Sequence, residues 1–176
     1  MRSKLRRTWL APLWMLGALL FAGCGPGVGG TGTGDAAFEA FGVSAAPVCG
    51  GTVAAQLACP STPAGPVAVG TLPVQFVDAA GQVVLQVNGN LATLDASCLR
   101  LHFSGEFGSG TAGVQGFFGS YQIGGNGFDV LAALSTVPVA GGGALTVELH
   151  DVDGHVAVGP VLLPRAAGPL PPPNPC

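Results

Sequence analysis

The densest group of side chains that could do chemistry lies in a six-residue stretch, where His150 and His155 flank Asp151 and Asp153. A tight hairpin turn at this point would bring two imidazoles and two carboxylates together, and such a set can bind a divalent metal. The stretch lacks the spaced ligands and the closing Glu of a calcium loop. Asp and Gly are equally the residues that a hairpin turn requires. We therefore expect that the Asp and Gly residues of this stretch serve to form a hairpin turn. The two histidines and two aspartates are weak candidates for metal ligands, and we expect no cofactor.

A second polar group is Arg100, His102 and Glu106, which fall on one face of the segment 98–107 if that segment is a strand. Such a group could act as an acid–base cluster. The solvated face of an antiparallel sheet has the same pattern, and that is the reading we favour. No serine lies in the Gly-x-Ser-x-Gly sequence of a nucleophile elbow, including those in the Gly-rich segments, Ser104, Ser109 and Ser120. We expect no catalytic residue and no enzymatic activity.

The segment 114–123 contains the candidate binding residue, Phe118. Strand alternation turns Phe118 away from its aromatic neighbours and places it between small residues. An exposed ring with small neighbours makes a shallow shelf on which a sugar ring or an apolar partner can stack. We expect an envelope protein or a glycan as the partner. The alternative, which we favour, is that a loop or the preceding segment covers Phe118 through Phe38 or Phe41.

The composition limits the class of protein that can carry these residues. The chain has 176 residues, of which 48% are hydrophobic and only 9% are charged, the opposite of a disordered, charge-rich chain. Its net charge of −3 offers no basic surface for nucleic acid. The 30 Gly and 15 Pro must therefore be explained within one folded domain.

The N-terminus has the features of an export signal. Four of the six basic residues fall within residues 2–7, and the run from Thr8 to Gly23 is apolar and uncharged. This run is shorter than the roughly 20 residues that span a bilayer. We therefore interpret it as a secretory signal rather than a membrane span.

The end of this run, Leu19-Leu20-Phe21-Ala22-Gly23-Cys24, resembles the lipobox of bacterial lipoproteins. The resemblance implies attachment of diacylglycerol to the Cys24 thiol, cleavage after Gly23, and acylation of the new N-terminus. It also implies anchoring in the lipid bilayer of the cell envelope, with the outer membrane favoured because Gly25, and not Asp, follows. Phe21 stands where the family usually has Leu, and cleavage by an ordinary signal peptidase is the alternative.

Removal of the signal leaves two basic residues against nine acidic ones, a net charge of −7. Four cysteines then remain besides Cys24, an even number that indicates two disulfides in an oxidising compartment. Three connectivities are possible. We expect Cys98–Cys176, because Cys98 falls on the polar face of its segment within reach of a surface tail, and a local Cys49–Cys59 pair.

Alternation of apolar and polar residues between Gly-rich turns predicts eight strands. They are residues 72–78, 82–87, 91–95, 98–107, 114–123, 128–135, 145–150 and 155–163. The fold class is therefore all-β, an antiparallel meander that forms either a small sandwich or an up-and-down barrel. We expect a signal at 1–23, a Gly-rich tether at 24–47, a β-domain at 48–165 and a Pro-rich tail at 166–176. Within the tether, Asp35 is placed to cap one short helical turn that carries Phe38 and Phe41.

Taken together, the residues predict a membrane-anchored lipoprotein of the bacterial envelope that is a non-enzymatic structural or binding module. One alternative is a carrier of small hydrophobic ligands within a β-barrel. A less favoured one is a metal-dependent hydrolase that uses His150, Asp153 and His155.

Overall fold

The computed structural model describes residues 33–57, 59, 74–125, 127–168 and 176, all within a unit that covers residues 32–176. The expected signal sequence, Cys24 and the first part of the tether lie outside the described residues. So does the Pro-rich segment 169–175. None of the helices described is long and apolar enough to cross a membrane.

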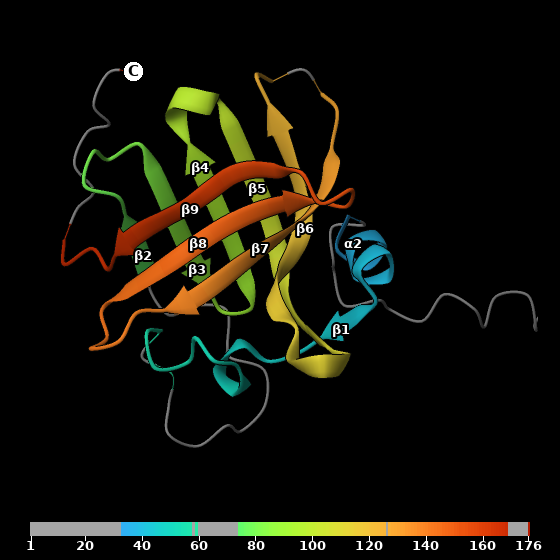
Figure 1. The fold of residues 1–176 in the computed structure, drawn as a ribbon, viewed down its shortest axis with the longest axis horizontal. Helices are drawn as coiled ribbons and strands as arrows, with labels where there is room; N and C mark the ends of the chain where they lie inside the picture. Colours follow the sequence, from blue (N-terminus) through green and yellow to red (C-terminus); the bar gives the residue numbers. More distant parts are fainter. Residues whose placement is uncertain (1–32, 58, 60–73, 126, 169–175) are drawn as a thin grey trace, which may run out of the picture. The chain divides into compact units, whose positions relative to one another are not determined.

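Eight of the nine strands follow one another up and down, and each pairs antiparallel with the next (Figure 1). They are β2 (Val74–Val77), β3 (Val83–Asn88), β4 (Leu91–Ala96), β5 (Leu101–Gly110), β6 (Gln115–Ile123), β7 (Val130–Pro138), β8 (Ala144–Asp151) and β9 (Val156–Pro164). The ninth strand, β1 (Val43–Ala45), pairs with the end of β5. The predicted meander is confirmed. It could be predicted because Gly-rich turns and the alternation of apolar and polar residues depend on neighbouring residues in the sequence.

The two edges of the meander approach each other, so the sheet is a nearly closed barrel and not a sandwich. A single bridge joins Phe76 of β2 to Arg165, just beyond β9. The amide of Ala166 also donates to the carbonyl of Gln75, over 2.8 Å. Most of the length of β9 pairs only with β8, so closure on this side depends on a few contacts.

Alternation places the apolar residues of each strand inside this barrel. In β8, Leu145, Val147 and Leu149 are buried, while the residues between them point outward. Rings and branched side chains from every strand of the meander join one continuous core; its largest members are Phe76, Phe103, Phe107, Phe117, Leu85 and Leu94. Space is tight between β5 and β6, where a Cβ on Gly119 would overlap the carbonyl oxygen of Ser104.

One end of the barrel is closed by the segment before β2. The 3₁₀ helix η1 (Val48–Gly50) and the turns that follow it place Val48 and Val53 in the core. Asn90, in the β3–β4 turn, fixes this segment through its amide group. Its Nδ2 donates to the carbonyl of Ala46 over 2.8 Å, and its Oδ1 accepts from the amide of Val48 over 2.9 Å.

The helix α2 (Thr33–Phe41) packs on the outer face of the sheet over β5, β6 and β7 (Figure 1). It ends where Gly42 adopts a positive φ of 64°, and β1 follows directly. Residues 33–45, which we expected to belong to the tether, are therefore part of the folded unit. The expected helical turn is present and extends over nine residues, but the helix begins at Thr33, so Asp35 lies in its first turn and is not its N-cap.

Two further 3₁₀ helices connect the strands, η2 (Ser97–Leu99) and η3 (Thr111–Gly113). The strand expected to begin at Cys98 begins instead at Leu101. Cys98 lies in η2, and Arg100 has a left-handed φ of 49°. The alternating pattern of residues 98–107 therefore extends three residues beyond the strand.

Candidate functional site

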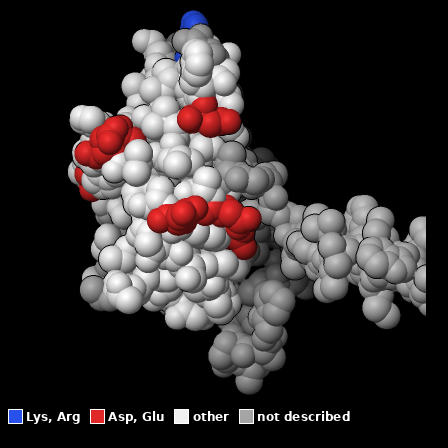
Figure 2. All heavy atoms as spheres, turned by 90° about the vertical axis from the view of Figure 1, so that its right-hand side faces the viewer, with Lys and Arg blue, Asp and Glu red and all other residues white. Residues whose placement is uncertain are grey.

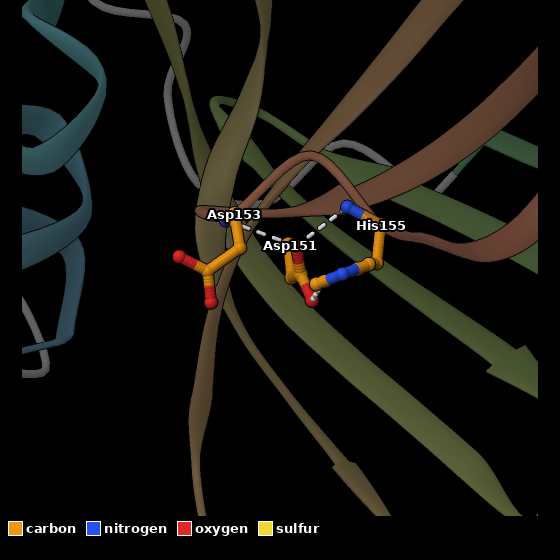
Figure 3. A network of polar contacts seen from close by, with 3 residues as sticks. All are labelled: Asp151, Asp153 and His155. Carbon is orange, nitrogen blue, oxygen red and sulfur yellow. Dashed lines mark hydrogen bonds and ion pairs between the residues drawn. The ribbon is translucent and has the colours of Figure 1, made fainter.

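The Asp- and His-rich stretch forms the turn between β8 and β9 (Figure 3). Asp151 organises the turn: its Oδ1 accepts from the amides of Asp153, over 3.0 Å, and of His155, over 2.8 Å. Its Oδ2 lies 3.1 Å from Nδ1 of His155. Gly154 supplies the positive φ of 83° that the turn needs. The structure therefore shows the expected hairpin turn, held by the carboxylate of Asp151.

The pKa of Asp151 is the result of opposing effects. Burial raises the pKa of this carboxyl, because the side chain is only 13% exposed. Hydrogen bonds from the backbone and ring of His155, the charge of that ring and the amide of Asp153 together lower the pKa below its usual value. Asp151 is therefore ionised at neutral pH. Burial, followed by the nearby charge of Asp151, raises the pKa of Tyr121 on β6.

Three of the four weak metal candidates come together. Oxygen and nitrogen atoms of Asp151, Asp153 and His155 lie within 4.8 Å of one another. His150 is not part of this group, because alternation turns it to the outer face of β8, where its Nε2 lies 3.6 Å from Glu148. Both oxygens of Asp151 are already engaged by the turn. The geometry is that of a hairpin turn held by a carboxylate, with two exposed side chains beside it.

The expected polar group on β5 does not form a cluster. Arg100 precedes the strand, and Glu106 lies four residues beyond His102. His102 instead pairs with Asp95 of β4, whose Oδ1 lies 2.7 Å from its Nδ1, with both side chains exposed. Asp95 was missed because the register of β4 on β5 is not visible in the sequence.

Phe118 does not form an exposed shelf. It is only 2% exposed, and the rings of Phe38 and Phe41 lie over it, with centroids 6.2 Å and 5.5 Å away. The alternative that the preceding segment covers this ring is the one observed. Gly108 makes the packing possible, because a Cβ there would lie 2.9 Å from the ring of Phe38.

Both disulfides join the expected partners. Cys49 is bonded to Cys59 within the segment that closes one end of the barrel. Cys98 is bonded to Cys176 over a separation of 78 residues. The second pair was predicted correctly, but Cys98 is exposed because it lies in η2 and not because it falls on the polar face of a strand.

One exposed aromatic residue was overlooked in the sequence. Phe128, in the connection between β6 and β7, is 81% exposed. The signal was its position directly after Gly124-Gly125-Asn126-Gly127, a sequence too rich in glycine to cover a ring. Alternation had placed it instead at the start of a strand.

No protein family model, curated protein sequence or solved structure matches this chain. The fold and the surface chemistry must therefore support any functional proposal. A barrel-like β-domain stapled by two disulfides is compatible with a binding or structural module.

Proposed function

We propose that the chain is a lipid-anchored lipoprotein of the bacterial cell envelope, with the outer membrane favoured, and that its β-domain is a non-enzymatic binding or structural module. The observation that carries the proposal is the pair of disulfides, because disulfides persist in oxidising compartments outside the cytosol. The lipobox-like sequence that ends at Cys24 supplies the anchor.

The distance between the anchor and the domain supports a membrane-proximal position. Nine peptide units connect Cys24 to Thr33, where α2 begins. At about 3.3–3.6 Å per residue, they span at most about 30 Å. Two or three acyl chains on Cys24 would give stable anchoring, because each buried CH₂ contributes about 0.8 kcal/mol. The domain would therefore act on what lies close to the membrane surface.

The barrel supports a module that works through its outer surface. Large apolar side chains form a continuous core inside the sheet, and η1 with its following turns covers one end. His150 is not in the group formed by Asp153 and His155, because it lies beside Glu148 on the outer face of β8, and this weakens the hydrolase alternative. A surface module needs only exposed side chains on a rigid frame, and the antiparallel sheet supplies that frame.

The test compares the wild-type chain with Cys24→Ser in a Gram-negative host. We expect the wild-type chain in the membrane fraction, beginning at Cys24, with an N-terminal peptide whose mass includes the acyl chains. Cys24→Ser should lose the acyl mass and leave the membrane fraction or retain its signal. A wild-type mature chain without acyl mass would contradict the anchor.

Gly25→Asp is the matched variant for the choice of membrane. The lipoprotein resemblance implies that this change moves the anchored protein from the outer to the inner membrane, with the acyl mass retained. Non-reducing peptide mapping serves as the folding control, since every variant should keep Cys49–Cys59 and Cys98–Cys176. A Gly25→Asp protein distributed like the wild type would contradict the outer-membrane assignment.

A further inference from the structure

Exposed apolar side chains lie at both ends of the barrel, and Leu91, Val114, Val137 and Leu162 lie at or towards the end that η1 closes. In an antiparallel meander, alternate connections lie at the same end. The β2–β3, β4–β5, β6–β7 and β8–β9 connections therefore lie opposite the end that η1 closes. We call the surface that the last three of these form, with the strand ends beside them, the rim. Five of the nine large apolar residues that are exposed in the described part of the chain belong to the rim: Leu99, Ile123, Phe128, Val152 and Val156.

Hydrogen bonds join the three connections into one surface. The amide of Gly124 donates to the carbonyl of Arg100 over 2.9 Å, which holds the β6–β7 connection against η2. The amide of Val152 donates to the carbonyl of Leu131 over 3.0 Å, which holds the β8–β9 turn beside the start of β7. Figure 1 shows the β4–β5 and β6–β7 connections next to each other at the upper end of the barrel.

A row of polar side chains runs along the outer side of the rim. Asp95 pairs with His102, with 2.7 Å between Oδ1 and Nδ1, and His102 lies opposite Gln122 in the register of β5 and β6. Gln122 in turn donates from Nε2 to Oδ1 of Asp129 over 2.8 Å. The row therefore has a carboxylate at each of its two ends, Asp95 and Asp129.

The charge of the rim is negative. It carries the carboxylates of Asp95, Asp129, Asp151 and Asp153 against the single guanidinium of Arg100, a net charge of −3 with histidine neutral. Acidic side chains form several separate groups on the face seen in Figure 2, and blue is confined to its upper edge. A partner that covers the apolar residues must also neutralise these carboxylates.

We propose that the rim is the docking surface for a partner protein that presents an apolar centre surrounded by lysine and arginine. The proposal rests on the function of the domain as a binding module, but not on acylation of Cys24. Apolar contact supplies the buried area, and the surrounding opposite charges set the orientation and the association rate. Phe128 is the natural anchor, because exposed aromatic residues dominate the energetics of such interfaces.

Charge distinguishes this partner from two others that would also cover apolar residues. Lipid headgroups of bacterial membranes that carry negative charge attract basic surfaces, and the rim is acidic. A second copy of the chain would bring two surfaces of like charge together in a twofold interface. A cationic protein surface would be attracted to the rim, whereas anionic headgroups and a second acidic rim would both be repelled by it.

The probe is a fluorescent amphipathic peptide with leucine on one face and lysine on the other. Its control is the same peptide with glutamate in place of lysine. Binding to the full chain in a non-ionic detergent is followed by fluorescence anisotropy, with protein-free micelles as the blank. We expect the lysine peptide to bind at least tenfold more tightly than the glutamate peptide, with an affinity that falls as salt is raised.

Variants locate the binding surface. Phe128→Ser should weaken binding of the lysine peptide about tenfold, and Asp129→Asn with Asp153→Asn should weaken it and reduce its salt dependence. The matched controls are Val137→Ser and Glu39→Gln, which change an exposed apolar and an exposed acidic residue away from the rim and should leave the affinity unchanged. All variants lie at exposed positions, so the folded state should be retained.

Three results would overturn the proposal. The first is equal binding of the two peptides, and the second is an affinity for the lysine peptide that the rim variants leave unchanged. The third is binding of the rim, in the acylated chain, to anionic phosphatidylglycerol vesicles in preference to the peptide. This preference would be measured as protection of the introduced thiol in Phe128→Cys from a thiol reagent. Failure of Cys24 acylation would leave the peptide result intact, so the two proposals fail separately.

Discussion

At the scale of single residues, Asp151 shows how a residue type suited to metal chemistry serves the backbone instead. Its two oxygens accept hydrogen bonds from the turn and contact the ring of His155. A carboxylate in this position satisfies amides that would otherwise lack partners in the connection. Asp153 and His155 remain exposed beside it, free to contact a partner at the rim.

The lowered pKa of Asp151 predicts a pH-dependent contribution to stability. Since folding depresses this pKa below its ordinary value of 3.8, the stabilisation is fully present above that value and is lost as the pH falls through the folded pKa. Asp151→Asn should therefore lower the free energy of unfolding at pH 6, and the difference from the wild type should shrink at pH 3. Urea unfolding at both pH values measures it.

Asp153→Asn is the control for this measurement, because its carboxylate is exposed and does not accept the hydrogen bonds of the turn. It should unfold like the wild type at both pH values. A destabilisation by Asp151→Asn that is the same at pH 3 and pH 6 would show that the charge of Asp151 does not act in the turn.

At the scale of elements, α2 and β1 form a small structure of their own on the outside of the barrel. Their apolar cluster, made of Ala37, Phe38, Val43 and Phe118, is separate from the barrel core. α2 and β1 follow each other directly in the sequence. The cluster also includes Phe118, which belongs to β6. Such a peripheral unit can open locally without the rest of the domain.

Removal of one ring should test this separation. Phe38→Ala deletes a ring that packs on Phe118 and should destabilise the docked helix by about 3 kcal/mol. Amide hydrogen exchange should rise over residues 33–45, with the exchange of β3, β4 and β8 nearly unchanged. Ala40→Ser, at an exposed position of the same helix, is the control. Exchange that rises equally in all strands would show that α2 and the barrel are one cooperative unit.

At the scale of the whole molecule, the barrel is closed unevenly. Hydrogen-bonded registers join every pair of consecutive strands from β2 to β9. Among the described residues, β2 is joined to the chain just beyond β9 by the Phe76–Arg165 bridge and the hydrogen bond from Ala166 to Gln75. The Cys98–Cys176 disulfide adds a covalent connection between the end of the chain and η2. The two disulfides differ greatly in the length of chain that they enclose.

This difference predicts unequal contributions to stability. Loss of a disulfide returns more conformational entropy to the unfolded chain when the enclosed loop is longer. The resulting loss of stability is about 4.5 kcal/mol for a separation of 78 residues and about 2.7 kcal/mol for one of 10. Replacing Cys98 and Cys176 by serine should therefore lower the free energy of unfolding more than replacing Cys49 and Cys59. Urea unfolding of the two double variants measures both values. The reverse order would show that native-state contacts near Cys49 outweigh chain entropy.

The sequence was informative wherever the determining interactions are local. Alternation in Leu145–Leu149 and the glycines of the turns predicted the strands of the meander, because side-chain period and turn backbone depend on adjacent residues. It left open whether Phe118 is exposed or covered, because this exposure depends on α2, which lies about eighty residues earlier. The sequence also predicted that the strand β5 begins at Cys98, because the alternation of apolar residues continues into the 3₁₀ helix η2.

By itself, the sequence determined the all-β class, the order of strands and the role of Asp151 as a turn residue, and it predicted the cysteine pairing among three possible connectivities. Only the tertiary structure decided between barrel and sandwich, because that choice depends on whether Phe76 of β2 meets Arg165 after β9. It also decided that Phe118 is covered while Phe128 is exposed. Exposure is a property of packing between distant segments, and a local pattern can place a side chain on a face without saying what covers that face.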